Sequence, residues 1–283
     1  MAIVSFWSNG KEETAKTLSI VSIATNMAIE HNFKILVMST NYNDDTLESC
    51  FWKKSENNRR QAIVASFGGP NAVHDIDSGI EGLAKNVRAN RATPEIIRNY
   101  TKIVFKDRLE VLLSIKSKSY EEYLRLRSYY VEILQAANQY YDLVFVDLNK
   151  GFNDDFAESV LNISDLIISN ITQKLTIIDD FMQIKKSNKI FQTDKNMLLI
   201  GRYDRFSKFN SKNLTRYLNE KQEIPTIPYN TLFFEACNDA NVADFFLRFR
   251  LVDETDRNAF FIKEVNKAAE KIVYKLQELQ MKM

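Results

Sequence analysis

The beginning of the chain has the pattern of a buried strand, a short polar turn and a helix. Ala2–Trp7 is an apolar run of strand length, and polar residues with Gly10 interrupt it. After Thr14 the apolar residues recur at helical spacing, which gives a helix with one buried face made of Ile20, Val21, Ala24, Met27 and Ala28. The turn therefore lies where a strand leads into a helix N-terminus, and we expect the fold to be arranged around it.

The turn has the pattern of a phosphate-binding loop. Gly10–Thr17 reads GKEETAKT and matches G-x-x-x-x-G-K-[ST] except that Ala15 replaces the second glycine. Such a turn binds phosphate because its backbone N–H groups converge with the positive end of the helix dipole. Lys16 stands where a lysine would add positive charge, and Thr17 where a hydroxyl would bind magnesium. The alternative is a solvated turn before an ordinary helix, with Thr14 as N-cap and the lysines in water.

The same turn resembles the deviant P-loop, K-G-G-x-G-K-[ST], of ATPases of the ParA/MinD family in the SIMIBI class of P-loop NTPases. Lys11 stands five places before Lys16, where the family has its signature lysine. The family's three glycines correspond to Glu12, Glu13 and Ala15. The resemblance implies a homodimer that binds ATP or ADP with Mg²⁺, in which Lys11 reaches across the dimer.

The replaced glycines predict a degenerate P-loop. A Cβ at a left-handed backbone position costs roughly 1–2 kcal/mol. A carboxylate about 4 Å from a phosphate charge adds roughly 4 kcal/mol of repulsion at an effective dielectric constant of 20. Glu12 and Glu13 are therefore expected to remove much of an ordinary nucleotide affinity.

Composition favours one compact domain over residues 1–283, because seven glycines and four prolines leave little for linkers and 45% hydrophobic content is ample for a core. The formal net charge of +1 does not indicate a nucleic-acid partner, which only a local patch would bind. Cys50 and Cys237 are far apart in sequence and favour a reducing compartment over a disulfide framework. The chain has no basic leader and no apolar run near the roughly 20 residues of a membrane span, so we expect a cytoplasmic protein.

A second apolar strand is predicted at Phe33–Met38. At its end the family carries an acidic D-x-D pattern that positions magnesium and the attacking water, and here Ser39 and Asn41 occupy those places. Half of the hydrolytic apparatus is therefore expected to be missing or displaced to Asp44 or Asp45. We favour the alternative that these two aspartates belong to the start of a helix.

A third buried strand ends in Asp147, at the edge of the sheet where ligands collect in α/β folds. Tyr141–Leu148 supplies this strand, and a carboxylate there is either a helix cap or, as the resemblance implies, the Walker B aspartate that orders magnesium through water. Leu148–Gly151 resembles the switch segment of the family.

The segment between residues 51 and 140 has weaker signals. A basic cluster, typical either of a solvated loop or of a surface for an acidic partner, consists of Lys53, Lys54, Arg59 and Arg60. Helices are expected to start near 75–83 and at Thr93-Pro94. A strand at Leu109–Ile115 and a single helix at Tyr120–Tyr140 follow.

Strands and helices alternate through the second half. The predicted strands are Asp165–Ser169, Asn196–Ile200 and Thr226–Pro228, and the predicted helices are Leu175–Lys185 and Asn210–Glu220. Strands separated by helices at this spacing form right-handed βαβ units. The predicted fold is α/β, a mostly parallel twisted β-sheet with helices on both faces, which the resemblance identifies as a ParA/MinD-like P-loop NTPase.

Two strand ends also resemble the parts of the family's site that bind the nucleotide base. Gly201 stands where the family has an asparagine that reads adenine, and Arg202 follows it. Ile227 and Pro228 begin a segment, continued by Phe234–Ala236, that resembles the loop lining the base pocket in MinD-like proteins.

The chain is predicted to end in one long helix over about 256–283. Its apolar stripe consists of Phe261, Val265, Ala268, Ile272, Leu276 and Leu279. MinD proteins end in an amphipathic membrane-targeting helix, which would normally be more strongly basic than this one. We therefore expect this helix to pack against the domain or a partner helix rather than a membrane.

Three functions remain open. We favour a pseudo-ATPase of this fold, a positioning or scaffold factor with weak or no ATP hydrolysis and a protein partner of unknown identity. The second is an active dimerising ATPase that partitions DNA or localises a division, pilus or secretion apparatus, with Lys11 and Asp147 as catalytic residues and Thr17 and Asp147 as magnesium ligands. The third is a Rossmann-like enzyme, which would lack G-x-G-x-x-G after the first strand. The nucleotide-binding residues that the resemblance implies are Gly10, Lys11, Thr14, Ala15, Lys16, Thr17, Arg202, Ile227 and Pro228.

Overall fold

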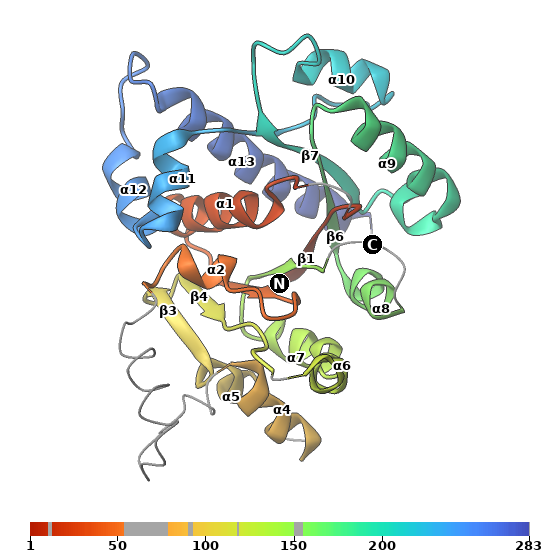
Figure 1. Ribbon diagram of the computed structural model, residues 1–283, viewed down its shortest axis with the longest axis vertical. Coiled ribbons are helices and arrows are strands. Elements are labelled where there is room, and N and C mark those ends of the chain that lie inside the picture. Colours follow the sequence, from red (N-terminus) through yellow and green to blue (C-terminus); the bar gives the residue numbers. More distant parts are fainter. Residues whose placement is uncertain (11–12, 54–78, 90–92, 118, 150–154, 283) are drawn as a thin grey trace.

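A single mixed sheet is the centre of the fold (Figure 1). The computed structural model describes residues 1–10, 13–53, 79–89, 93–117, 119–149 and 155–282. Over these residues the sheet has eight strands in the order β3-β4-β2-β5-β1-β6-β7-β8, and every neighbouring pair is parallel except β3 and β4. The strands are β1 (Ala2–Trp7), β2 (Ile35–Ser39), β3 (Thr101–Phe105), β4 (Leu109–Leu112), β5 (Leu143–Asp147), β6 (Leu166–Ile171), β7 (Asn196–Tyr203) and β8 (Thr226–Pro228).

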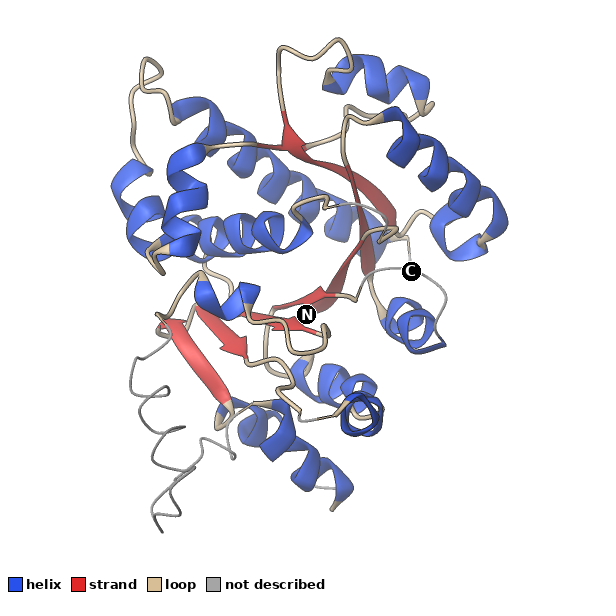
Figure 2. Cartoon of the chain, viewed as in Figure 1, coloured by secondary structure: helices blue, strands red, loops and turns tan. Residues whose placement is uncertain are grey.

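Helices cover both faces of this sheet (Figure 2), as the sequence predicts. One face carries α1 (Lys16–Glu30), α2 (Thr46–Ser49), α11 (Thr231–Asn238), α12 (Val242–Phe249) and α13 (Ala259–Met281). The other carries α4 (Ile80–Arg88), α5 (Pro94–Arg98), α6 (Tyr120–Arg127), α7 (Tyr130–Ala137), α8 (Asp155–Ile163), α9 (Leu175–Ser187), the 3-10 helix η1 (Lys189–Gln192) and α10 (Ser211–Tyr217).

The strands are apolar on both sides because each side faces a separate core. In β1, Val4 and Phe6 belong to the core under α1 and α13, whereas Ile3 and Trp7 belong to the core under α7 and α9. A strand buried on both faces shows a continuous apolar run rather than alternation, which is the pattern of Ala2–Trp7. The predicted α/β fold class is confirmed.

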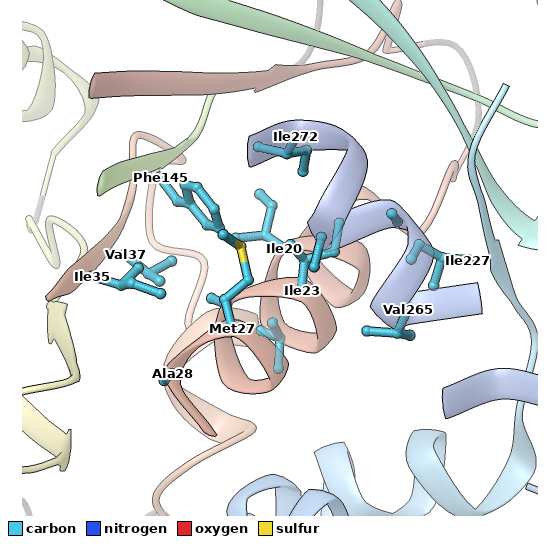
Figure 3. Close-up of a cluster of buried hydrophobic side chains, with 14 of the residues drawn as sticks. Ile20, Ile23, Met27, Ala28, Ile35, Val37, Phe145, Ile227, Val265 and Ile272 are labelled. Atoms are coloured by element: carbon cyan, nitrogen blue, oxygen red, sulfur yellow. The ribbon is translucent and has the colours of Figure 1, made fainter. Parts of the chain in front are cut away.

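The C-terminal helix packs on the domain, as expected. Val265 and Ile272 of α13 lie against Ile20 and Ile23 of α1 (Figure 3), and all four side chains are buried. The helix runs from Ala259 to Met281, so the predicted bounds of 256–283 were too wide. No helix in the described parts of the chain combines the length and apolar character needed to cross a bilayer.

Three segments differ from the sequence prediction. The edge strand β3 was missed because it is half exposed and lacks a buried apolar run. The expected single helix Tyr120–Tyr140 is divided into α6 and α7, and Ser128 is the C-cap of α6. The expected loop at Phe234–Ala236 is part of α11, which starts after Asn230 because its side-chain oxygen accepts a hydrogen bond from the Phe233 N–H at 2.8 Å.

Other bounds shift by a few residues. The strand expected at Phe33–Met38 is Ile35–Ser39, and the one expected at Leu109–Ile115 ends at Leu112. Thr93 is the N-cap of α5 with Pro94 at its first position, as predicted. Parts of the basic cluster, of the helix start near 75–83 and of the switch-like segment fall outside the described residues; they are Lys54, Arg59, Arg60, 75–78, Lys150 and Gly151.

Candidate functional site

The turn between β1 and α1 bends through two left-handed positions. Gly10 has φ +80° and Ala15 has φ +53°, and Ala15 rather than Thr14 is the N-cap of α1, with no side-chain capping bond. The interpretation of Thr14 as N-cap was therefore wrong. A left-handed position suits glycine, so the Cβ of Ala15 carries the strain of roughly 1–2 kcal/mol expected from the sequence.

Lys16 is buried in an ion pair. Its Nζ lies 2.8 Å from Asp147 Oδ1, with side-chain exposures of 4% and 1%, and it also donates to the Leu148 carbonyl. The alternative that the lysines lie in water is therefore wrong for Lys16, whereas Lys11 is outside the described residues. The pair forms because β5 is adjacent to β1 in the sheet, which places the C-terminal end of β5 beside the start of α1.

A hydroxyl and an amide complete the surroundings of Asp147. Thr17 Oγ1 donates to Asp147 Oδ2 at 2.6 Å, and Asn41 Nδ2 lies 3.4 Å from the same oxygen and 3.0 Å from Ser39 Oγ. Ser39 and Asn41, which stand where the family has acidic residues, thus lie beside the strand-end carboxylate. Neutral side chains at these two positions add no negative charge next to Asp147, whose ion-pair partner among the described residues is Lys16.

Two tyrosines hold the end of β2 next to this group. Tyr130 donates to the Ser39 carbonyl at 2.8 Å, and Tyr123 donates to the Thr40 carbonyl at 2.7 Å. Burial raises the pKa of Tyr130 well above its usual range, so the phenol stays protonated and remains a donor. The backbone that carries Asn41 is therefore fixed from the core side.

Asp44 has a local structural role. Its Oδ1 accepts hydrogen bonds from the Thr46 N–H at 2.9 Å and from the Thr46 hydroxyl at 2.5 Å, at the start of α2. The interpretation of Asp44 as a residue of a helix start is therefore confirmed, and Asp45 is the N-cap of the same helix. Asp44 also lies in the wall of the cavity described next.

A cavity of about 490 Å³ joins the turn to the ends of β7 and β8. Of the predicted site residues, the structure brings together in its wall Thr14, Ala15, Lys16, Thr17, Arg202, Ile227 and Pro228. Asp147 lies behind this wall in contact with Lys16 and Thr17, and Gly10 lies at the far end of the turn. The roles assigned to these residues stay predictions, but their convergence is a property of the fold.

Gly201 lies at the junction of the turn with β7. A Cβ at this position would lie 2.2 Å from the Thr14 carbonyl oxygen and 2.8 Å from Asn170 Nδ2. Asn170 Nδ2 in turn donates to the Thr14 carbonyl at 3.0 Å. The asparagine that the resemblance implies at this position therefore has no space here, because the turn packs directly on the strand.

The other end of the cavity is lined mostly by residues to which the sequence analysis gave no binding role. They come from α2 and α11, helices far apart in sequence, and include Cys50, Phe233, Cys237 and Asn238. Tyr229 and Phe234 contribute aromatic rings whose centroids are 6.4 Å apart, with 57% and 43% of their surfaces exposed. Phe234 belongs to the segment that the resemblance placed at the base pocket, whereas no local motif marks Cys50, Phe233, Cys237 or Asn238 as cavity residues.

Comparisons with known proteins were made for sequence and for structure. No protein-family model and no curated protein matches the sequence. The structure is similar to a ParA family ATPase from Chlorobium tepidum TLS, with 13% identity, a TM-score of 0.67 and coverage of 95% of this chain and 98% of that one.

Two MinD structures are similarly close. The septum site-determining protein MinD from Pyrococcus horikoshii OT3, complexed with Mg-ADP, has 15% identity and a TM-score of 0.65, covering 97% of this chain and 98% of that one. The MinC:MinD cell division protein complex from Aquifex aeolicus matches with 15% identity and a TM-score of 0.63, covering 96% of each chain. At this level of identity the similarity concerns the fold, and the chain therefore has the ParA/MinD-like fold of P-loop NTPases.

Proposed function

We propose that the protein is a single ParA/MinD-like domain that binds an adenine nucleotide with Mg²⁺, hydrolyses ATP weakly or not at all, and acts as a positioning or scaffold factor. The observation that carries this proposal is the cavity of about 490 Å³, whose wall contains Lys16, Thr17, Arg202, Ile227 and Pro228. Its volume is within the range of about 300–1,000 Å³ that small-ligand sites occupy.

The end of the cavity near α1 suits phosphate and magnesium. The first N–H groups of α1 and the Lys16 ammonium supply positive charge there. Thr17 Oγ1 and Asp147 Oδ2 lie 2.6 Å apart and fit a magnesium ion, which such sites hold through one or two protein oxygens together with substrate phosphates. The ion would neutralise phosphate charge, while Lys16 would exchange its carboxylate partner for phosphate oxygens.

Weak turnover follows from the neighbours of this group. Lys16 already neutralises Asp147 and donates to Leu148, so a nucleotide has to replace internal contacts. Asn41 lies where the family has a carboxylate for the attacking water, and an amide is not a general base at neutral pH. Glu13 is exposed in the cavity wall and repels phosphate. These features support binding without efficient hydrolysis.

We also propose that the protein forms a homodimer and binds another protein. The Aquifex MinD of similar fold was solved in a complex with MinC. Lys11, which the resemblance places across a dimer interface, is outside the described residues, so this part rests on the sequence. A membrane role is not favoured, because the apolar stripe of α13 is buried against α1 and β8.

The alternative is an active ATPase. The retained contacts among Lys16, Thr17 and Asp147 favour it, since these three residues are the core of a phosphoryl-transfer site. The Rossmann-like enzyme receives no support from the fold comparison.

Two measurements test the proposal. Isothermal titration calorimetry of the purified chain with ADP or ATP and Mg²⁺ should detect binding, and either nucleotide should raise the melting temperature. Phosphate release from ATP should stay at the level of a Lys16→Ala control. Lys212→Ala, on the exposed surface of α10, is the matched control and should bind like the wild-type protein.

The outcomes separate the alternatives. Phosphate release that Lys16→Ala abolishes would establish the active ATPase. Failure of millimolar ADP and ATP to shift the melting temperature or release heat would contradict both nucleotide functions.

A further inference from the structure

The two cysteines of the chain meet at the cavity. Cys50 is the C-cap of α2 and Cys237 lies in α11, and both are free thiols with exposures of 1% and 4%. The Cys50 thiol lies next to that of Cys237 and is the main cause that raises the pKa of Cys237, and both side chains line the cavity. The fold therefore brings together two cysteines that are far apart in sequence.

The backbones of two helices set this contact. Cys50 Sγ donates to the Thr46 carbonyl at 3.2 Å, which orients the thiol along α2. Cys237 lies one turn after Phe233, whose ring is buried among Phe245, Phe246 and Phe261. Both cysteines belong to the same core on one face of the sheet. The two thiols are therefore neighbours within one core, although their helices are far apart in sequence.

We propose that Cys50 and Cys237 are a modification site, at which a peroxide oxidises the two thiols to a reversible disulfide between α2 and α11. Peroxide is small enough to reach the thiols through the cavity that they line. Transient disulfides of this kind are the form in which reducing compartments use such bonds.

The reaction is balanced by one hydrogen peroxide molecule. The sulfur of Cys50 attacks one peroxide oxygen, the O–O bond breaks, and water leaves with the thiol proton, which gives a sulfenic acid. The sulfur of Cys237 then attacks the oxidised sulfur, the S–O bond breaks, and a second water carries away the Cys237 proton. Two thiols are oxidised and one peroxide is reduced. The first attack falls to Cys50, because the neighbouring Cys50 thiol and burial raise the pKa of the Cys237 thiol well above its usual range.

The bond would fix one wall of the cavity. The segment ending at Cys50 carries Asp44 and Thr46, and α11 carries Phe233 and Phe234, all of which line the cavity. A link between the two helices therefore fixes their positions relative to each other in this wall. One consequence rests on the proposed function: a bound nucleotide covers the thiols and slows their oxidation.

The test uses the full, reduced chain and hydrogen peroxide. We expect the intact mass to fall by two hydrogen atoms, a peptide containing Cys50 to be linked to one containing Cys237, and dithiothreitol to restore both. Cys237→Ser should stop at a sulfenic acid on Cys50 that dimedone traps, and Cys50→Ser should form no intramolecular bond. Absence of the linked peptide in the wild-type chain, or oxidation only to sulfinic acid or to links between chains, would overturn the proposal even if both variants fail to fold.

Repeating the oxidation with Mg-ADP separates this inference from the proposed function. A slower reaction supports the expectation that the nucleotide covers the thiols. An unchanged rate of oxidation at saturating Mg-ADP would overturn that expectation. Disulfide formation in a chain that binds no nucleotide by calorimetry would leave the modification site standing and contradict only the nucleotide function.

Discussion

The two ends of the cavity differ in whether their side chains already have partners within the protein. At the end near α1, the charge of Lys16 is neutralised by Asp147, and Thr17 donates to the same carboxylate. At the end near α11, Tyr229 and Phe234 keep 57% and 43% of their surfaces exposed. A ligand entering the cavity replaces internal bonds at the first end and covers free surface at the second.

This difference predicts that substitutions at the α1 end change the stability of the fold, whereas substitutions at the α11 end change ligand binding. Residues at the α1 end stabilise the fold whether or not a ligand is present, because they join β1, β5 and α1. The exposed rings of Tyr229 and Phe234 at the α11 end contribute little to stability and are available to a ligand. A chain of this fold can therefore keep the residues of a phosphate site for a structural reason after turnover is lost.

The largest effect is expected at the α1 end. Lys16→Ala leaves the carboxylate of Asp147 buried and unpaired, which costs about 3–5 kcal/mol of unfolding free energy in such pairs. Urea unfolding without nucleotide measures it.

A second variant shows whether the loss comes from the unpaired charge. Lys16→Ala combined with Asp147→Asn should recover a large part of the stability, because no buried charge remains. Lys212→Ala, an exposed lysine, should change it by less than about 0.5 kcal/mol. A loss below about 1 kcal/mol for Lys16→Ala would mean that the two ends do not differ as described.

The next effect concerns the junction of the turn with β7. Gly201→Ala places a Cβ 2.2 Å from the Thr14 carbonyl oxygen, so the turn or the strand has to move. Such overpacking costs about 1–3 kcal/mol. We expect this loss in urea unfolding together with weaker nucleotide binding by calorimetry. Unchanged stability would show that the turn does not pack on β7 in solution.

The framework of the fold was predictable because short apolar runs in the sequence indicate buried strands. Ala2–Trp7 and the strand ending at Asp147 were identified from these runs, and their adjacency follows from parallel topology. Strand β3 was not predicted because its side chains are half exposed. The break between α6 and α7 was not predicted because the apolar stripe continues across it. Patterning reports what is buried and does not report where a buried helix is interrupted.

The candidate site was predictable where its residues stand at the ends of strands with a recognisable apolar pattern. Lys16, Thr17 and Asp147 follow strands of recognisable pattern, and the structure brings them together. The contact of Cys50 with Cys237 depends on where α2 and α11 lie over the sheet, which no local pattern encodes. The close packing at Gly201 also depends on the fold, because the backbone of Thr14, which is distant in sequence, occupies the space that a side chain would need.

A smaller effect, on binding rather than stability, is expected at the α11 end. Tyr229→Ala and Phe234→Ala remove exposed rings from the cavity, so each should weaken ADP binding by about 1 kcal/mol, typical of an aromatic contact. Their melting temperatures should change little. Tyr274→Ala, which removes a ring of 59% exposure from α13 outside this cavity, is the matched control for calorimetry. Equal ADP affinity in all three variants would contradict the role given to this end.

The smallest effect distinguishes strain at the turn from its use in binding. Ala15→Gly removes a Cβ from a left-handed position, which relieves roughly 1–2 kcal/mol, while the greater freedom of glycine in the unfolded chain offsets about 0.5–1 kcal/mol. The net gain in unfolding free energy should be at most about 1.5 kcal/mol. Ala240→Gly, at φ +59° between α11 and α12, removes the same strain at a position that does not line the cavity and should give the same gain. Only Ala15→Gly should also raise nucleotide affinity, because it lets phosphate approach the turn; equal affinities in the two variants would show that the turn is a structural element and not a binding loop.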